Sequence, residues 1–273
     1  MLKTLFKIAC WMLLAGAVCA AEQEVGRGIR IGLIIDDLGN QKALGEQLVA
    51  LPGPVTLAFL PQTPFAWHLA TLANEQGKEI MLHLPMESDN GLPLGRGALT
   101  LEMPRERFLR TLRRNLSSVP YLSGVNNHMG SLLTRDPTAM RWLMGELRRE
   151  GLYFIDSRTT DMTVAERVAD IQQIPNSRRD IFLDNTPDED AIRRQLQKLV
   201  ALARNKGSAI GIGHPYPATI KVLREALPAL ARQGIELVPV SEIVFSGRRT
   251  WHASSSPSPK AVKSLKLSPS QIF

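Results

Sequence analysis

Residues 31–40 read IGLIIDDLGN, and this stretch decides the fold. Its first five residues, Ile31 to Ile35, form a short apolar run rich in β-branched side chains. Such a run is typical of a strand buried on both faces, and strands of that kind belong to parallel sheets covered by helices. The run ends in two adjacent carboxylates, Asp36 and Asp37, before Gly39. These acids therefore lie at the carboxyl end of a parallel strand, where α/β folds build their ligand sites.

Apolar runs of the same kind recur along the chain, and each ends in polar or turn residues. The runs are IGLII, VTLAFL, EIMLHL, GVNN, LYFI, IFL, AIGI and ELVPV. Amphipathic stretches with helix signals separate most of them, at residues 104–117, 136–150, 187–206 and 217–233. This alternation predicts an α/β fold, a distorted or incomplete (β/α) barrel with seven to eight parallel strands. A doubly wound open sheet is the alternative, but no glycine-rich phosphate loop follows the first strand.

The two ends of the chain differ from its central part. Residues 1–20 carry two lysines, then an apolar stretch and then small residues, which is the order of a secretory signal cleaved before Ala21. An uncleaved membrane anchor is the alternative, although the apolar stretch is short for a span. Residues 21–29 are a lead-in, residues 30–246 the barrel domain, and residues 247–273 a basic Ser/Pro/Lys-rich tail for which we expect disorder. We therefore expect an exported protein, periplasmic or otherwise extracytoplasmic, with no transmembrane segment in its mature form.

Cysteine content and charge exclude several functional classes. Both cysteines, Cys10 and Cys19, lie in the predicted signal, which excludes cysteine catalysis and cysteine metal sites from the mature chain. Seven of the 33 basic residues lie in the signal or the tail, where there is no acid, so residues 21–246 hold 26 basic and 26 acidic residues. A neutral domain lacks the basic face that nucleic-acid binding requires, and we expect no nucleic-acid partner.

Three histidines follow or end predicted strands: His83 the third, His128 the fourth and His214 the seventh. A single histidine at such a place is more often a structural, partly buried residue than a ligand. Three histidines at the edge that carries Asp36 and Asp37 favour a shared site, because unrelated structural histidines have no reason to share one edge.

A divalent metal such as Zn²⁺ gives this cluster a chemical purpose. Zinc binds imidazole and carboxylate, and its charge lowers the pKa of water so that the water can attack a carbonyl. One acid can hold the ion while its neighbour takes a proton. Adjacent strand residues point to opposite faces, so we expect the backbone to turn at Leu38–Gly39 and bring both acids to the site.

Five segments, in this order, resemble the divergent polysaccharide deacetylases, a branch of the carbohydrate deacetylase superfamily. The segments are IIDDLG (34–39), HLPME (83–87), NNHMGS (126–131), FIDSRTT (154–160) and GIGHP (211–215). The resemblance covers residues 30–245 and implies a distorted (β/α) barrel. In the superfamily the first acid of the pair is the base, the second holds the metal, and a late histidine is the general acid. The resemblance therefore implies these roles for Asp36, Asp37 and His214 respectively.

The chain also departs from the superfamily pattern. Other members hold the metal with two histidines four residues apart, whereas His83 is followed four positions later by Glu87. Either Glu87 or His128 completes the site, and we favour His128 because imidazole suits zinc. The third-motif arginine has no counterpart near Asn127. Asp156 either orients a histidine, contacts substrate or caps the following helix. We assign Glu87, Asn127 and Asp156 to substrate binding or to support of the ligands.

The resemblance implies one divalent metal, with zinc expected, held by Asp37, His83 and His128. It also implies a hydrolase that cleaves the amide bonds of an N-acetylated envelope glycan, with peptidoglycan as one candidate. The alternative is an inactive relative that serves as an accessory or glycan-binding protein of the cell envelope. A carboxylate pair acting without metal is disfavoured, because Asp36 and Asp37 are too close in sequence to flank a glycosidic bond.

The signal-like start generates a prediction about export. We expect the mature chain to begin at Ala21 and to be recovered in soluble form outside the cytoplasm. Intact-mass measurement of envelope fractions should give the mass of residues 21–273. A chain that retains residues 1–20 and is recovered only with membranes would identify this segment as an anchor.

Overall fold

The computed structural model describes residues 28–246. The predicted signal, nearly all of the lead-in and the predicted disordered tail lie outside this range. Among the described residues, no helix combines the length and the apolar character needed to cross a bilayer.

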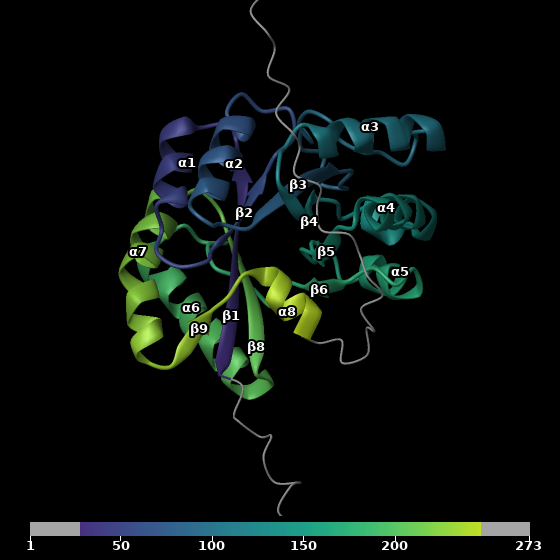
Figure 1. Ribbon diagram of the computed structural model, residues 1–273. Coiled ribbons are helices and arrows are strands. Elements are labelled where there is room, and N and C mark those ends of the chain that lie inside the picture. The colour runs from purple at the N-terminus through teal and green to yellow at the C-terminus, as the bar shows by residue number, and fades with distance from the viewer. Residues whose placement is uncertain (1–27, 247–273) are drawn as a thin grey trace, which may run out of the picture.

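The described residues form one parallel sheet of nine strands that curls into an incomplete barrel (Figure 1). Its strands are β1 (Ile29–Leu38), β2 (Thr56–Phe59), β3 (Ile80–Met86), β4 (Leu122–Met129), β5 (Tyr153–Asp156), β6 (Asn176–Arg178), β7 (Ile181–Phe182), β8 (Ser208–Gly213) and β9 (Ile235–Leu237). The order is β6-β5-β4-β3-β2-β1-β8-β7, and β9 pairs with the first residues of β1. The barrel is open between β6 and β7.

Helices follow most of the strands, as the alternation in the sequence predicts. They are α1 (Lys42–Val49), α2 (Ala66–Glu75), α3 (Arg105–Ser117), α4 (Pro137–Glu150), α5 (Ala165–Ile171), α6 (Glu189–Lys206), α7 (Pro217–Arg232) and α8 (Val240–Ser246), with a 3₁₀ turn at Leu133–Arg135. The helix α4 begins where the stretch 136–150 predicts it, and Asp136 caps it by accepting hydrogen bonds from the backbone N–H groups of Thr138 and Ala139.

Two short elements differ from the expectation. The strand β6 was not predicted, because its residues, NSR, are polar and only partly buried and so lack the apolar signature of a strand. The last predicted run, ELVPV, is a strand only through Leu237, and Val240 already begins α8. The backbone N–H of Val240 donates to Thr56 Oγ1, which turns the chain into the helix.

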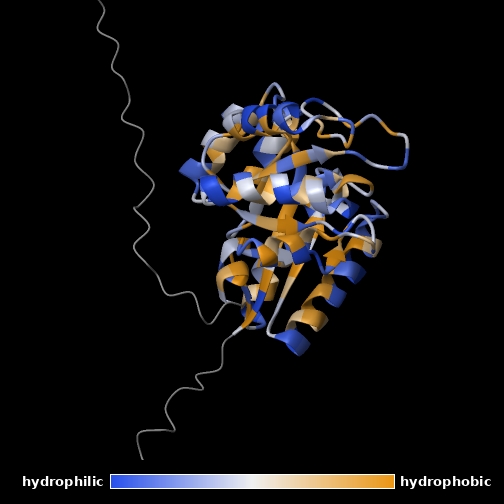
Figure 2. Cartoon of the chain, turned by 90° about the vertical axis from the view of Figure 1, so that its right-hand side faces the viewer, coloured by the Kyte–Doolittle hydropathy of each residue, from blue (hydrophilic) through white to orange (hydrophobic). Residues whose placement is uncertain are grey.

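The two faces of the sheet pack into two cores. On β1 the side chains of Ile31, Leu33 and Ile35 belong to the outer core, against the surrounding helices, whereas Ile34 belongs to a smaller inner core. The helix α8 closes this inner core by packing on β1, β6 and β8. Figure 2 shows the central strands as largely apolar and the helices with polar residues on their outer faces. The interior below the carboxyl ends of the strands is therefore filled with side chains.

A pair of glycine substitutions tests this packing. A Cβ atom at Gly124 in β4 would lie 2.5 Å from ring atoms of Tyr153 on β5, so Gly124→Ala should destabilise the fold by about 1–3 kcal/mol. At Gly145 in α4 the nearest atom would be 3.7 Å away, and Gly145→Ala should stabilise the helix by up to about 1 kcal/mol. Urea unfolding measures both. Equal effects of the two substitutions would contradict the close packing of Tyr153.

Candidate functional site

A bulge in β1 brings both acids of the pair to one side of the sheet. Ile35 pairs with Leu57 and Leu38 with Phe59, so three steps along β1 match two steps along β2. Ile35 and Leu38 both belong to the outer core, and the two acids between them line the same cavity inside the barrel edge. Asp37 has a φ of 59°, a left-handed conformation that Asp tolerates better than most residues. The expected turn is present, because β1 ends at Leu38 and Gly39 has a φ of 114°, but the bulge at the acid pair itself is what brings both acids to the cavity.

Three candidate metal ligands converge at this bulge. The Oδ1 atom of Asp37 lies 3.2 Å from His83 Nε2 and 3.0 Å from His128 Nδ1. The candidate ligand atoms of the three residues all lie within 4.8 Å of one another. His83 comes from β3 and His128 from β4, whose register pairs His83 with Asn126. The structure therefore brings together the set that the sequence analysis favours.

The donor atoms of this cluster fit a divalent cation. The Oδ1 atom of Asp37 is buried and makes no hydrogen bond of suitable geometry, although both imidazoles contact it. His83 Nδ1 lies 2.9 Å from the amide oxygen of Asn126, which can only accept, so Nδ1 donates this hydrogen bond and Nε2 is the ring nitrogen left to face the cluster. One carboxylate and two imidazoles are a donor set that zinc binds.

The two adjacent acids ionise differently. Burial raises the pKa of Asp36 and outweighs the charge of His83. Burial also opposes ionisation of Asp37, but contacts with His128 and His83 hold its pKa well below its usual range. For His83, burial alone would lower the pKa, whereas the charges of Asp36 and Asp37 raise it to about 9. Environments that shift two neighbouring acids in opposite directions suit them to different roles, ligand for one and proton acceptor for the other.

His214 lines the same cleft as expected, and it is paired with Asp184, a residue to which the sequence analysis gave no role. Asp184, which follows β7, contacts His214 Nδ1 at 2.8 Å, and its Oδ2 accepts from the backbone N–H of His214 at 2.6 Å and from Thr219 Oγ1 at 2.7 Å. Burial lowers the pKa of His214, but the hydrogen bond to Asp184 and the charge of Asp36 give a net increase. The signal for Asp184 was present in the sequence, because it follows the apolar run IFL as Asp36 follows IGLII.

The three residues assigned to substrate binding or support take different places. Asn127 lines the cavity, accepting from the backbone N–H of Ser157 and donating to the carbonyl of Met129. Glu87 lies outside the ligand cluster, and its Oε2 accepts from the backbone N–H of Leu101 at 2.6 Å. Asp156 is fully buried and accepts from the backbone N–H of Arg158, which makes it part of the turn after β5.

The candidate residues share one cleft. A cavity of about 340 Å³ contains both acids, the three histidines and a wall of polar side chains from the loops after β3, β4 and β5. An adjoining hollow of about 310 Å³ shares Asp37, His128 and His214 with it and extends to Tyr216. Each volume lies at the lower end of the range of about 300–1,000 Å³ that is usual for small-molecule sites.

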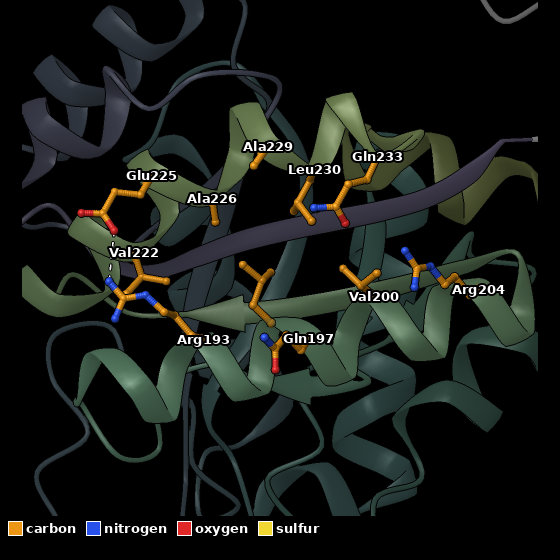
Figure 3. Close-up of a pocket in the computed structure, with 11 residues that line it drawn as sticks. Arg193, Gln197, Val200, Arg204, Val222, Glu225, Ala226, Ala229, Leu230 and Gln233 are labelled. Carbon is orange, nitrogen blue, oxygen red and sulfur yellow. Dashed lines mark hydrogen bonds and ion pairs between the residues drawn. The ribbon is translucent and has the colours of Figure 1, made fainter.

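Another hollow, of about 400 Å³, lies between α6 and α7 on the outside of the barrel (Figure 3). Its floor is apolar, with Leu196, Val222 and Leu230, and Arg193 and Glu225 form an ion pair of 3.0 Å at one end. Since both helices pack on the outer face of the sheet, this hollow adds no group to the candidate site.

The fold is shared with a solved deacetylase structure, and the sequence matches a family model. The incomplete barrel aligns with the solved structure of T48 deacetylase with substrate at a TM-score of 0.50, over 81% of this chain and 92% of that chain. The sequence identity is 14%, so this likeness concerns the fold. Residues 33–244 match the family model described as divergent polysaccharide deacetylase. The chain belongs to that family.

Relatives from several bacteria match most of this chain. It is 38% identical to the uncharacterized protein YibQ of Escherichia coli (strain K12) over 215 residues, which are 79% of this chain and 67% of YibQ. It is 34% identical to an uncharacterized protein of Haemophilus influenzae strain Rd, over 78% of this chain and 76% of that protein. The crystal structure of an uncharacterized protein from Agrobacterium tumefaciens C58 aligns with a TM-score of 0.77 at 26% identity, over 80% of this chain and 90% of that chain.

The ligand cluster predicts how metal binding responds to substitution. Asp37→Ala, His83→Ala and His128→Ala should each abolish stoichiometric binding of a divalent ion, because each removes one of three converging donors. Glu87→Gln is the matched control and should retain the ion, since Glu87 lies outside the cluster. Elemental analysis of purified variants measures the result. Retention of the ion in both histidine variants together with its loss in Glu87→Gln would show that the ligand set is wrong.

Proposed function

We propose that this protein is an exported, metal-dependent deacetylase that hydrolyses N-acetyl groups on a cell-envelope glycan. The observation that carries the proposal is the arrangement of the cleft. A buried acid, Asp36, and a carboxylate-held imidazole, His214, line the same cavity as the three candidate ligands. Amide hydrolysis needs these functions together, because a base, an electrophile and an acid for the leaving amine act on one carbonyl.

Asp37, His83 and His128 would hold a divalent cation, whose charge polarises the acetamide carbonyl and makes water acidic enough to attack it. The protein's own contribution is to orient these donors. Asn126 accepts from His83 Nδ1 and donates to Asp36 Oδ1 at 2.7 Å, so one amide fixes both the ligand and the acid beside it.

Asp36 acts as the general base. Its carboxyl group is only 1% exposed, and burial raises its pKa above the usual range, which makes the carboxylate a stronger proton acceptor than an exposed Asp. The hydrogen bond from Asn126 holds one oxygen in place. Asp36 therefore takes the proton of the attacking water.

His214 acts as the general acid. Asp184 fixes the ring through Nδ1, so Nε2 is the atom free to give a proton to the departing amine. The raised pKa of His214 keeps the ring protonated to a higher pH than an unperturbed imidazole. The amine then leaves in a neutral form rather than as an unstable anion.

The family description supports a glycan substrate, and T48 deacetylase, which shares the fold, has been solved with its substrate. The signal-like residues 1–20 support an extracytoplasmic site of action. An N-acetylated polymer such as peptidoglycan meets both conditions.

The proton roles predict the pH profile and the effects of substitution. Activity should rise as Asp36 ionises, at a pH above the usual carboxyl range, and fall as His214 loses its proton, above the usual imidazole pKa. Asp36→Asn and His214→Ala should each lower the rate of acetate release about 10²- to 10⁴-fold, with the fold and the metal content unchanged. Asp184→Asn should lower the pKa of His214, because it removes the carboxylate that stabilises the imidazolium. The fall of activity on the alkaline side of the pH profile should therefore move to lower pH.

Acetate release is measured on N-acetylglucosamine oligomers and on peptidoglycan fragments. If metal-loaded wild-type protein releases no more acetate than the Asp36→Asn/His214→Ala double variant and yet binds these glycans, the protein is an accessory glycan-binding protein instead.

A further inference from the structure

The turn after β5 carries a buried hydroxyl without a partner. Ser157 is 1% exposed and lines the cavity that holds the candidate catalytic residues. Its Oγ atom makes no hydrogen bond to any part of the chain that the structure describes. A buried hydroxyl in this condition is uncommon, because desolvation without a compensating hydrogen bond is unfavourable. Because Ser157 lines the ligand cavity, a molecule bound in that cavity can supply the missing partner.

The surrounding turn is held firmly, so the hydroxyl is not left over from a loose loop. Arg158 has a φ of 50°, and its backbone N–H donates to Asp156 Oδ1 at 2.8 Å. The backbone N–H of Ser157 donates to Asn127 Oδ1 at 2.8 Å. Arg179 donates to the carbonyl oxygens of Ser157 and Arg158 at 2.7 and 2.8 Å. These hydrogen bonds of the turn fix the backbone at Ser157, while the side chain of Ser157 remains without a partner.

Other hydroxyls on the same wall of the cleft already have partners. Ser88 and Ser131 form a hydrogen bond of 2.8 Å to each other, and Ser131 also bonds to Asp89. Thr159 Oγ1 donates to the carbonyl of Met129 at 2.9 Å. Ser157 therefore differs from its neighbours in the cavity by having an unused donor and unused acceptor sites.

We infer that Ser157 Oγ is a substrate-binding group that forms a hydrogen bond with a neutral ring hydroxyl of the sugar. The inference rests on the proposed function, and it adds a specificity-determining residue to it. A hydroxyl group both donates and accepts, so a sugar hydroxyl satisfies both capacities of the serine.

The charge of the cavity lining supports a neutral partner. Among the described residues that line it there is neither lysine nor arginine, and three of them are aspartates. The guanidinium groups of the surrounding loops are engaged elsewhere, and Arg158, the residue after Ser157, pairs with Asp161 at 3.4 Å. Arg135 pairs with Asp89 at 3.2 Å, and Arg179 binds backbone carbonyls and lies 3.8 Å over the ring of Phe182. Apart from the histidines of the candidate site, no side chain that lines the cavity can carry positive charge, and the three aspartates would repel a carboxylate or phosphate on the sugar.

The test uses Ser157→Ala in the full mature chain, with Ser117→Ala as the matched control. Ser117 is exposed at the end of α3 and undergoes the same chemical change away from the cleft. Ser157→Ala should raise KM for N-acetylglucosamine oligomers about three- to tenfold, with a smaller change in kcat, which is the size expected for one neutral hydrogen bond. Its Tm should be equal to or higher than that of the wild type, because no hydrogen bond within the protein is lost. A serine with a merely structural role would lower the Tm instead.

Substrate analogues identify the group that Ser157 contacts. We would measure each variant with oligomers that lack one ring hydroxyl at a time. With the analogue that lacks the contacted hydroxyl, wild type and Ser157→Ala should have the same KM, whereas they should differ with the others. If the difference persists with every deoxy analogue, or if Ser157→Ala matches wild type on the intact oligomer, the inference is overturned.

A binding measurement separates this inference from the proposed function. Calorimetric titration of the same oligomers into Asp36→Asn and into Asp36→Asn/Ser157→Ala reports affinity without turnover. Weaker binding by the double variant supports the role of Ser157 even if the wild type releases no acetate, a result that would refute only the deacetylase proposal. Equal affinities of the two variants would refute the role of Ser157 even if acetate release is observed.

Discussion

One extra residue in β1 is the constraint on which the candidate site depends. In a regular strand Asp36 and Asp37 would point to opposite faces, one to the cleft and one into the outer helical layer. The bulge between Ile35 and Leu38 keeps both flanking apolar side chains in the outer core and leaves both carboxylates at the cavity. The left-handed backbone at Asp37 is the local cost of this arrangement. Without it, one carboxylate could not be a ligand while the next serves as a base.

The two acids differ because Asp36 is buried beside an amide, whereas Asp37 contacts two imidazoles. Asn126 bridges Asp36 and His83, and because its oxygen accepts and its nitrogen donates, it sets the orientation of both groups. Asp36 is buried beside this amide, whereas Asp37 contacts both imidazoles, and burial and charge therefore move the two pKa values in opposite directions. Buried polar groups that satisfy one another in this way hold a rigid geometry, which a catalytic constellation requires.

The structure places His128, rather than Glu87, in the candidate ligand cluster beside Asp37 and His83. Strands β3 and β4 pair in parallel with His83 opposite Asn126, so His128 lies two residues further along β4 on the same face of the sheet. This register lets an imidazole from the neighbouring strand reach the position where Asp37 and His83 converge. Glu87 bonds instead to the backbone of the long loop after β3, and it is neither in the ligand cluster nor among the residues that line the cleft.

The sequence by itself determined the parallel (β/α) architecture, the helix boundaries near Asp136 and Pro217, and the edge at which Asp36, His83 and His214 meet, because hydrophobic periodicity and helix caps are local signals. It could not determine the bulge, because the register of β1 is fixed by pairing with β2, nor the polar strand β6, which has no apolar signature. Only the tertiary structure decided that Asp184 orients His214 across 30 residues and that the Ser157 hydroxyl lacks a partner. Hydrogen bonds between distant segments depend on distances that exist only after the strands have assembled, and residue order alone does not contain them.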